Sequence, residues 1–154
     1  VDLDPERSFL VGTLTVDLTI VEDTLAIPFN FHKQLTIIEV RDSEGTRLSL
    51  RTDDFTQDRI RVQAPDLMRQ GISVSWTFEF EGMLEQEQYA FLDVPSTQKA
   101  VIGPEGAHLF SEGHWFPSHR LVVDGATFDI RMTVPLGFSV VGPGTLAEIE
   151  TVGI

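Results

Sequence analysis

Apolar and polar residues alternate with a period of two along most of this chain. In residues 10–20 every second position is apolar or glycine, and threonine or aspartate occupies most of the positions between them. The longest clean alternation covers residues 72–80, and a similar one covers residues 127–134, where Pro135 ends it. Because successive side chains of a strand point to opposite faces, this pattern predicts strands that each bury one face.

Shorter strands are predicted between these, with turn residues at their ends. Residues 25–31 form one, and Pro28 on its opposite face predicts an edge strand, because proline cannot donate to a neighbouring strand. Residues 36–41 and 46–50 flank Asp-Ser-Glu-Gly at positions 42–45, which predicts a hairpin. Further short strands are expected at residues 60–63, 89–92, 109–110 and 138–141.

Helical patterns are weak and turns are frequent. Residues 65–71 offer one helical turn stopped by Gly71, and residues 83–88 are too few for an independent helix. Turn residues recur about every 8–12 residues, which is typical of β-sandwiches and barrels. We therefore predict an all-β fold, an antiparallel β-sandwich of two packed, saddle-like sheets with little helix. Residues 1–154 are expected to form one domain, with residues 93–112 as a long excursion off the sheets.

Composition restricts the partners of such a domain. Eleven Lys and Arg residues against 24 Asp and Glu give a net charge of -13. This acidic balance argues against nucleic acid, whose binding depends on neutralising phosphates. No apolar run approaches the roughly 20 residues of a membrane-spanning helix, and no signal peptide is recognisable, so the compartment stays open. The chain has no cysteine and begins at Val1 instead of methionine, as expected of a processed or excised piece.

No catalytic motif is recognisable. The histidines form no H-E-x-x-H pair, so no catalytic residue and no metal site are predicted within the chain; they are His32, His108, His114 and His119. No G-x-S-x-G nucleophile elbow is present, and close carboxylate pairs such as Glu79 and Glu81 are expected to be solvated.

The order of the features resembles the N-terminal β-sandwich of zinc aminopeptidases of the aminopeptidase N family, as a distant member. The resemblance covers residues 3–146. It rests on Asp4-Pro5, Gly12-Thr-Leu-Thr-Val16, Ile37-Ile-Glu-Val40, Leu67-Met-Arg-Gln-Gly71, the long strand at 72–80, the corner Phe116-Pro117, the strand ending in Val134-Pro135, and the glycine turn at 142–146. The chain departs from the family at Pro117-Ser-His-Arg120, where Pro-Cys-x-Asp is usual.

The resemblance implies a non-catalytic domain that packs on the catalytic domain following it in the same polypeptide. It implies no cofactor in this chain, with zinc expected only in the catalytic domain of the parent, a hydrolase. In the family, the loop before the aromatic-Pro corner lines the cleft and holds the free amino group of the peptide substrate. That loop is residues 105–113 here, and Glu105 and Glu112 are the positional candidates for substrate binding, against the simpler interpretation of solvated loop acids.

The alternative is a standalone β-sandwich that binds carbohydrate or protein through residues 93–119. It predicts exposed aromatic rings grouped on one surface at Tyr89, Phe110 and Trp115. The aminopeptidase-like hypothesis instead predicts that Trp115 and Phe116 are packed, and that an apolar patch marks the surface for the adjoining domain. A calcium site is a weaker third possibility because no D-x-D-x-D-G loop exists.

Overall fold

A computed structural model of the chain describes residues 1–52, 59–85, 100–110, 114–119 and 126–151. All the regular secondary structure in these ranges is β-strand. The strands are β1 (Asp2–Asp4), β2 (Phe9–Thr19), β3 (Thr24–Asn30), β4 (Leu35–Asp42), β5 (Ser49–Thr52), β6 (Arg59–Met68), β7 (Ser73–Met83), β8 (Ala100–Gly103) and β9 (Gly106–Leu109). The all-β prediction is confirmed.

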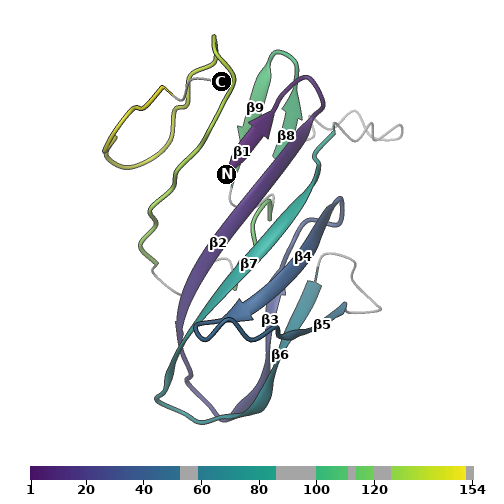
Figure 1. Cartoon of the computed structure of the whole chain (residues 1–154), viewed down its shortest axis with the longest axis vertical. Helices are drawn as coiled ribbons and strands as arrows, with labels where there is room; N and C mark the ends of the chain where they lie inside the picture. Colours follow the sequence, from purple (N-terminus) through teal and green to yellow (C-terminus); the bar gives the residue numbers. More distant parts are fainter. Residues whose placement is uncertain (53–58, 86–99, 111–113, 120–125, 152–154) are drawn as a thin grey trace, which may run out of the picture.

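The strands form two packed antiparallel sheets and a small hairpin (Figure 1). One sheet has the order β1-β2-β7-β4, the other has the order β3-β6-β5, and β8 pairs with β9 alone. β3 lies at an edge of its sheet, as Pro28 predicts. The molecule is therefore an antiparallel β-sandwich.

Aromatic side chains join the two sheets in the core. The ring of Phe29 on β3 packs edge-on against Phe78 on β7, with the centroids 5.0 Å apart, and Phe31 packs in the same way on Phe80 at 5.6 Å. Trp76 is buried beside them. The alternation predicted for residues 10–20 and 72–80 is thus confirmed, because its apolar positions face the space between the sheets, apart from Ile72, which is 42% exposed.

The predicted hairpin at residues 36–50 is correct in its turn and wrong in its pairing. Gly45, with φ 83°, donates its N–H to the carbonyl of Asp42 at 3.0 Å. Beyond the turn, the chain returns to β4 only at the bridge between Arg41 and Arg47. It then crosses to the other sheet, where β5 pairs with β6. Leu48 is buried where the chain crosses between the sheets. Its apolar side chain, which suggested a second hairpin strand, therefore packs between the two sheets.

The turn between β6 and β7 also differs from its prediction. Residues 65–68 belong to β6 and form no helical turn. Asp23 holds the turn that follows: its carboxylate accepts hydrogen bonds from the N–H of Gln70 at 2.8 Å and from Arg69 at 2.6 Å. The bond from Gln70, and then that from Arg69, lower the pKa of Asp23.

The C-terminal part of the described chain lacks the two strands predicted for it. Only Thr133 forms a bridge, parallel to Asp2, and Phe128 is 63% exposed. Residues 138–141 are likewise not a strand. These predictions are wrong because no described strand covers the apolar face of this segment. The strand predicted at residues 89–92 lies outside the described residues, and β9 extends the one predicted at 109–110 toward the N-terminus.

Candidate functional site

The aromatic-Pro corner, residues 114–119, is hydrogen-bonded to the edge strand β3. Asn30 and Ser118 exchange two backbone hydrogen bonds, of 2.7 and 3.0 Å. The ring N–H at Nδ1 of His119 donates to the carbonyl oxygen of Pro28 at 2.7 Å. The corner therefore covers the edge of β3, at which proline leaves no N–H to donate.

The rings of the corner are packed. Trp115 is only 5% exposed, and the half-buried Phe116 meets it edge-on with centroids 4.8 Å apart. Phe116 also contacts Phe128 at 6.0 Å. The packing expected of an aminopeptidase-like corner is confirmed. An exposed platform that includes Trp115 is excluded, although Phe110 is exposed and Tyr89 lies outside the described residues.

Glu105 lies at the tip of the β8–β9 hairpin. Gly103 and Gly106 are register partners, so Pro104 and Glu105 form the two-residue loop between them. The hairpin is anchored at Ile102, which is buried and donates its N–H to the carbonyl of Leu84 at 2.8 Å. The side chain of Glu105 is exposed. This hairpin is ordered structure inside the stretch predicted as an excursion.

The other candidate for substrate binding, Glu112, lies outside the described residues, so the structure does not bring the two acids together. Their role in holding an amino group stays a prediction. Sequence reasoning missed the hairpin that presents Glu105, although Gly-Pro-Glu-Gly at 103–106 is a turn sequence between short apolar stretches.

The described residues do not form a donor set for catalytic zinc, which needs three protein ligands and an open position. No three His, Asp or Glu side chains gather in the described ranges. His119 uses its Nδ1 on the backbone, and His108 is exposed on β9. These ranges also contain no helix of the length and apolarity needed to cross a membrane.

The fold defines the class of this protein: an all-β sandwich domain with a packed aromatic corner. No protein-family profile matches the chain, and no curated protein matches it. Solved structures of M1 zinc metallopeptidases are similar to part of it. One from Deinococcus radiodurans, a mutant bound to the substrate Tyr-Ser-Ala, is 18% identical, with a TM-score of 0.46, over 58% of this chain and 19% of that one.

A two-domain M1 zinc metallopeptidase mutant bound to L-arginine is similar to this chain to the same extent. It is 18% identical with a TM-score of 0.46, and the similarity covers 56% of this chain and 19% of that chain. The similarity thus spans about a fifth of the length of these peptidases. These solved structures are zinc metallopeptidases, as are the members of the family that the sequence resembles.

Proposed function

We propose that the chain is the non-catalytic β-sandwich domain of an aminopeptidase N-like zinc metallopeptidase. It packs on the catalytic domain of the same polypeptide and lines its substrate cleft, and the parent's zinc belongs to that other domain. The observation that carries the proposal is the apolar surface along residues 135–151. Leu136 is 89% exposed and Val141 is 95% exposed, and further exposed apolar side chains there are Phe138, Val140, Leu146 and Ile149.

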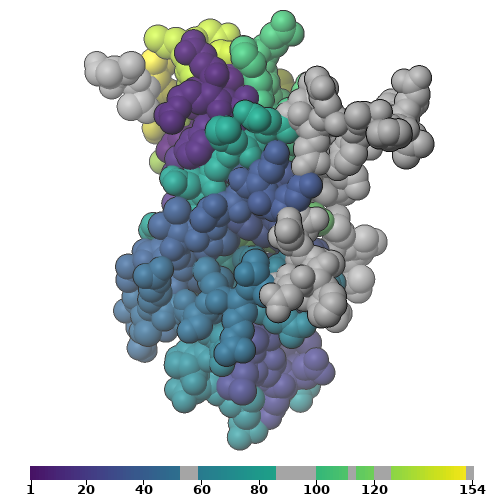
Figure 2. Space-filling model, turned by 90° about the vertical axis from the view of Figure 1, so that its right-hand side faces the viewer, coloured from purple at the N-terminus to yellow at the C-terminus, as the bar shows by residue number. Residues whose placement is uncertain are grey.

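The backbone hydrogen bonds found among the described residues join the chain to the sandwich at residues 131–133, just before this segment. Thr133 exchanges backbone hydrogen bonds with Val1 and Leu3, of 2.8 and 3.0 Å. Beyond it, the chain curls beside β1 and away from the sheets (Figure 1), and it lies at the same end of the molecule as the N-terminus (Figure 2). Contiguous exposed apolar surface marks interaction sites, and domains within one chain commonly bury about 600–1,500 Å² against each other.

A dye that binds apolar surface tests this docking surface. Replacing Leu136 and Val141 together by Asn is expected to reduce the binding of such a dye to the chain without lowering its urea midpoint, because both side chains are already exposed. Val21→Asn is the control, since Val21 is 78% exposed in a turn elsewhere. In the full-length parent the dye is expected not to bind at this segment. Dye binding that the double variant leaves unchanged would contradict the proposal.

Within the proposed function, Glu105 meets the free amino group of the peptide substrate, and Glu112, later in the stretch 105–113, is the second candidate. The anchored hairpin supports this role because it holds Glu105 on a defined turn. A carboxylate–ammonium hydrogen bond is worth about 1.5–3 kcal/mol. Glu105→Gln in the parent is therefore expected to raise KM about tenfold or more. Glu44→Gln, at an exposed turn between β4 and β5, is the control and should leave KM unchanged.

An aminoacyl-arylamide substrate tests whether peptidase activity belongs to the catalytic domain of the parent and not to this chain. The purified chain is expected to release no arylamine, whereas the parent should cleave it and lose activity to a chelator. Chelator-sensitive cleavage by the chain alone would refute the proposal. The reading frame beyond Ile154 offers a second check, because an H-E-x-x-H with a glutamate about 20 residues later would complete a zinc site.

A further inference from the structure

Two buried side-chain atoms of the described residues have no hydrogen-bond partner: Oε1 of Gln34 and Nε1 of Trp115. Trp115 is only 5% exposed, and Gln34 is half-buried with its amide oxygen enclosed. Nearly all buried polar atoms in folded proteins bond to protein groups or to ordered water, because an unpaired atom has lost its hydration without replacement. Each of these two atoms therefore needs a partner.

The two atoms belong to segments that are hydrogen-bonded to each other. Gln34 lies in the loop between β3 and β4, and Trp115 lies in the aromatic-Pro corner. The N–H of His32 in this loop donates to the carbonyl of His114 in the corner at 2.9 Å. Gln34 is two residues beyond His32, and Trp115 directly follows His114. The bond thus brings the two unpartnered atoms into the same part of the molecule.

Further contacts hold both segments in this position. In the loop, the N–H of Gln34 donates to Nδ1 of His32 at 3.2 Å, and the N–H of Leu35 donates to the carbonyl of His32 at 3.0 Å. In the corner, His114 has a positive φ of 51°, which a residue other than glycine keeps only where its surroundings hold it. Turning either segment toward solvent would break these contacts, so the missing partner must come to the buried atoms.

The chemistry of the two atoms is complementary. The amide oxygen of Gln34 can only accept a hydrogen bond, and the indole N–H of Trp115 can only donate one. A cation would satisfy the oxygen but not the N–H, and an anion would satisfy the N–H but not the oxygen. A buried ion would also pay for its own lost hydration. The pair therefore fits a small neutral molecule that both accepts and donates, and water is the smallest of these.

We propose that a single internal water molecule bridges Nε1 of Trp115 and Oε1 of Gln34. The water accepts the indole N–H and donates to the amide oxygen, which leaves its second hydrogen for a third bond, and buried waters make about three. The bridge requires the two atoms to lie at most about 5–6 Å apart, which is two hydrogen-bond lengths. It joins the corner to the loop by a contact nearly as favourable in enthalpy as a direct hydrogen bond.

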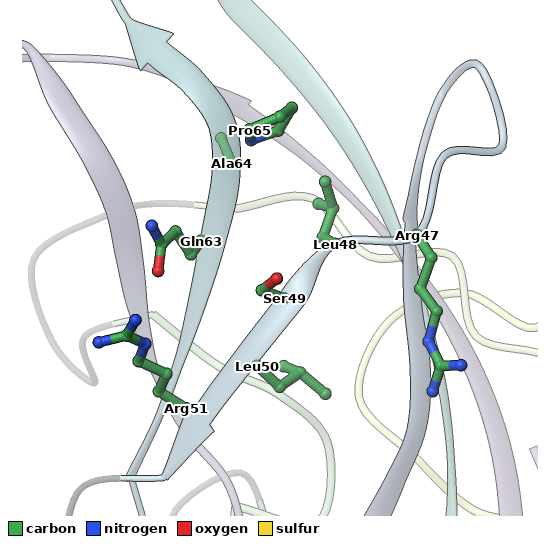
Figure 3. Close-up of a pocket in the computed structure, with 8 residues that line it drawn as sticks. All are labelled: Arg47, Leu48, Ser49, Leu50, Arg51, Gln63, Ala64 and Pro65. Atoms are coloured by element: carbon green, nitrogen blue, oxygen red, sulfur yellow. The ribbon is translucent and has the colours of Figure 1, made fainter.

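A second glutamine, Gln63 on β6, offers a matched comparison. It is half-buried like Gln34, and it lines a shallow hollow of about 440 Å³ together with Ser49, its register partner on β5 (Figure 3). Its side chain is not among those with a buried, unpartnered atom. Solvent in the hollow hydrates this amide, so Gln63 needs no enclosed water and serves as the control for Gln34.

NMR tests the proposal, because an enclosed water stays long enough to give a nuclear Overhauser effect to a neighbouring N–H. The unmodified chain is expected to show a cross-peak between water and the Nε1–H of Trp115, whose resonance is identified by its loss in Trp115→Phe. Gln34→Met removes the oxygen that holds the water and should abolish this cross-peak. Gln63→Met should leave it unchanged.

A crystal structure of the unmodified chain is a second measurement that does not depend on the folding of any variant. It is expected to show an ordered water within hydrogen-bond distance of both atoms. A direct hydrogen bond between Gln34 and Trp115, or separate waters on the two atoms, would overturn the proposal. So would an unmodified chain without the cross-peak, or a cross-peak that survives Gln34→Met.

Discussion

Among the glycines that the structure describes, Gly12 leaves the least room for a side chain. It lies opposite Phe80 in the pairing of β2 with β7. A Cβ atom at Gly12 would lie 2.3 Å from Cζ of Phe80 and 2.5 Å from Cε2. Phe80 is itself 1% exposed and packs edge-on against Phe31 of the other sheet. The ring cannot move aside into solvent, so an added methyl group must push it toward Phe31.

We predict that Gly12→Ala destabilises the chain by about 1–2 kcal/mol. Overpacking a core costs about 1–3 kcal/mol. Against this, the backbone of Gly12 lies outside the left-handed region, so alanine restricts the unfolded chain and returns about 0.4–1 kcal/mol. The net loss is a sizeable part of the ~5–15 kcal/mol that stabilises a domain.

Urea unfolding measures this loss as a shift of the midpoint at constant slope. Gly103→Ala on β8 is the matched control, because its Cβ meets no atom within 4 Å, and no loss is expected. Phe80→Leu frees the space at Gly12, so the two changes should couple by about 1 kcal/mol in a double-mutant cycle. A neutral Gly12→Ala, or effects that simply add, would refute the steric reasoning.

Three further predictions use the same unfolding assay or the tryptophans. Gly82→Ala should cost more than alanine at Gly12, because its φ is +154° and the new Cβ would lie 2.6 Å from the carbonyl oxygen of Gln34, which belongs to the rigid backbone; a smaller loss would contradict this. Asp23→Asn should lower the urea midpoint at neutral pH. The pKa of Asp23 in the folded chain is below its ordinary value of 3.8, so this stabilisation is present above pH 3.8 and is lost as the pH falls through the folded pKa. If the urea midpoints of the variant and the unmodified chain differ as much in strong acid as at neutral pH, the reasoning is wrong. Trp76 and Trp115 are both buried and should resist acrylamide quenching until urea unfolds the chain; ready quenching of the native chain would show that the corner is open.

The long strands could be predicted from the sequence because each of them buries a single face. Alternation identifies β2 and β7, whose apolar positions fill the core. It does not say which sheet a strand joins. Residues 46–50 have the pattern of a hairpin partner for β4, yet the chain crosses to the second sheet there and buries Leu48 on the way. A strand that pairs within one sheet and a strand that crosses to the other sheet have apolar residues at the same intervals. The sequence pattern therefore does not distinguish the two.

For the candidate sites, too, the sequence predicts some features and not others. Packing of Trp115 could be predicted from its apolar and proline neighbours, since a corner of this composition is more stable when buried. The hydrogen bonds between Ser118 and Asn30 could not be predicted from the sequence, because they join segments that are far apart along the chain. The proposed water site depends on such contacts as well. The loop of Gln34 and the corner of Trp115 are hydrogen-bonded to each other across the fold, and no local pattern encodes that contact.

The segment of residues 127–134 shows what alternation does and does not encode. Its apolar positions repeat as regularly as those of β2, yet Phe128 and Ile130 are exposed, while Met132 and Val134 are half-buried. The pattern predicts which face of the segment is buried, but it does not predict which part of the protein packs against that face. In β2 the cover is the opposite sheet, whereas no described strand covers residues 127–130. The proposed docking surface continues this exposed face, so under the proposed function we expect the catalytic domain of the parent to cover it.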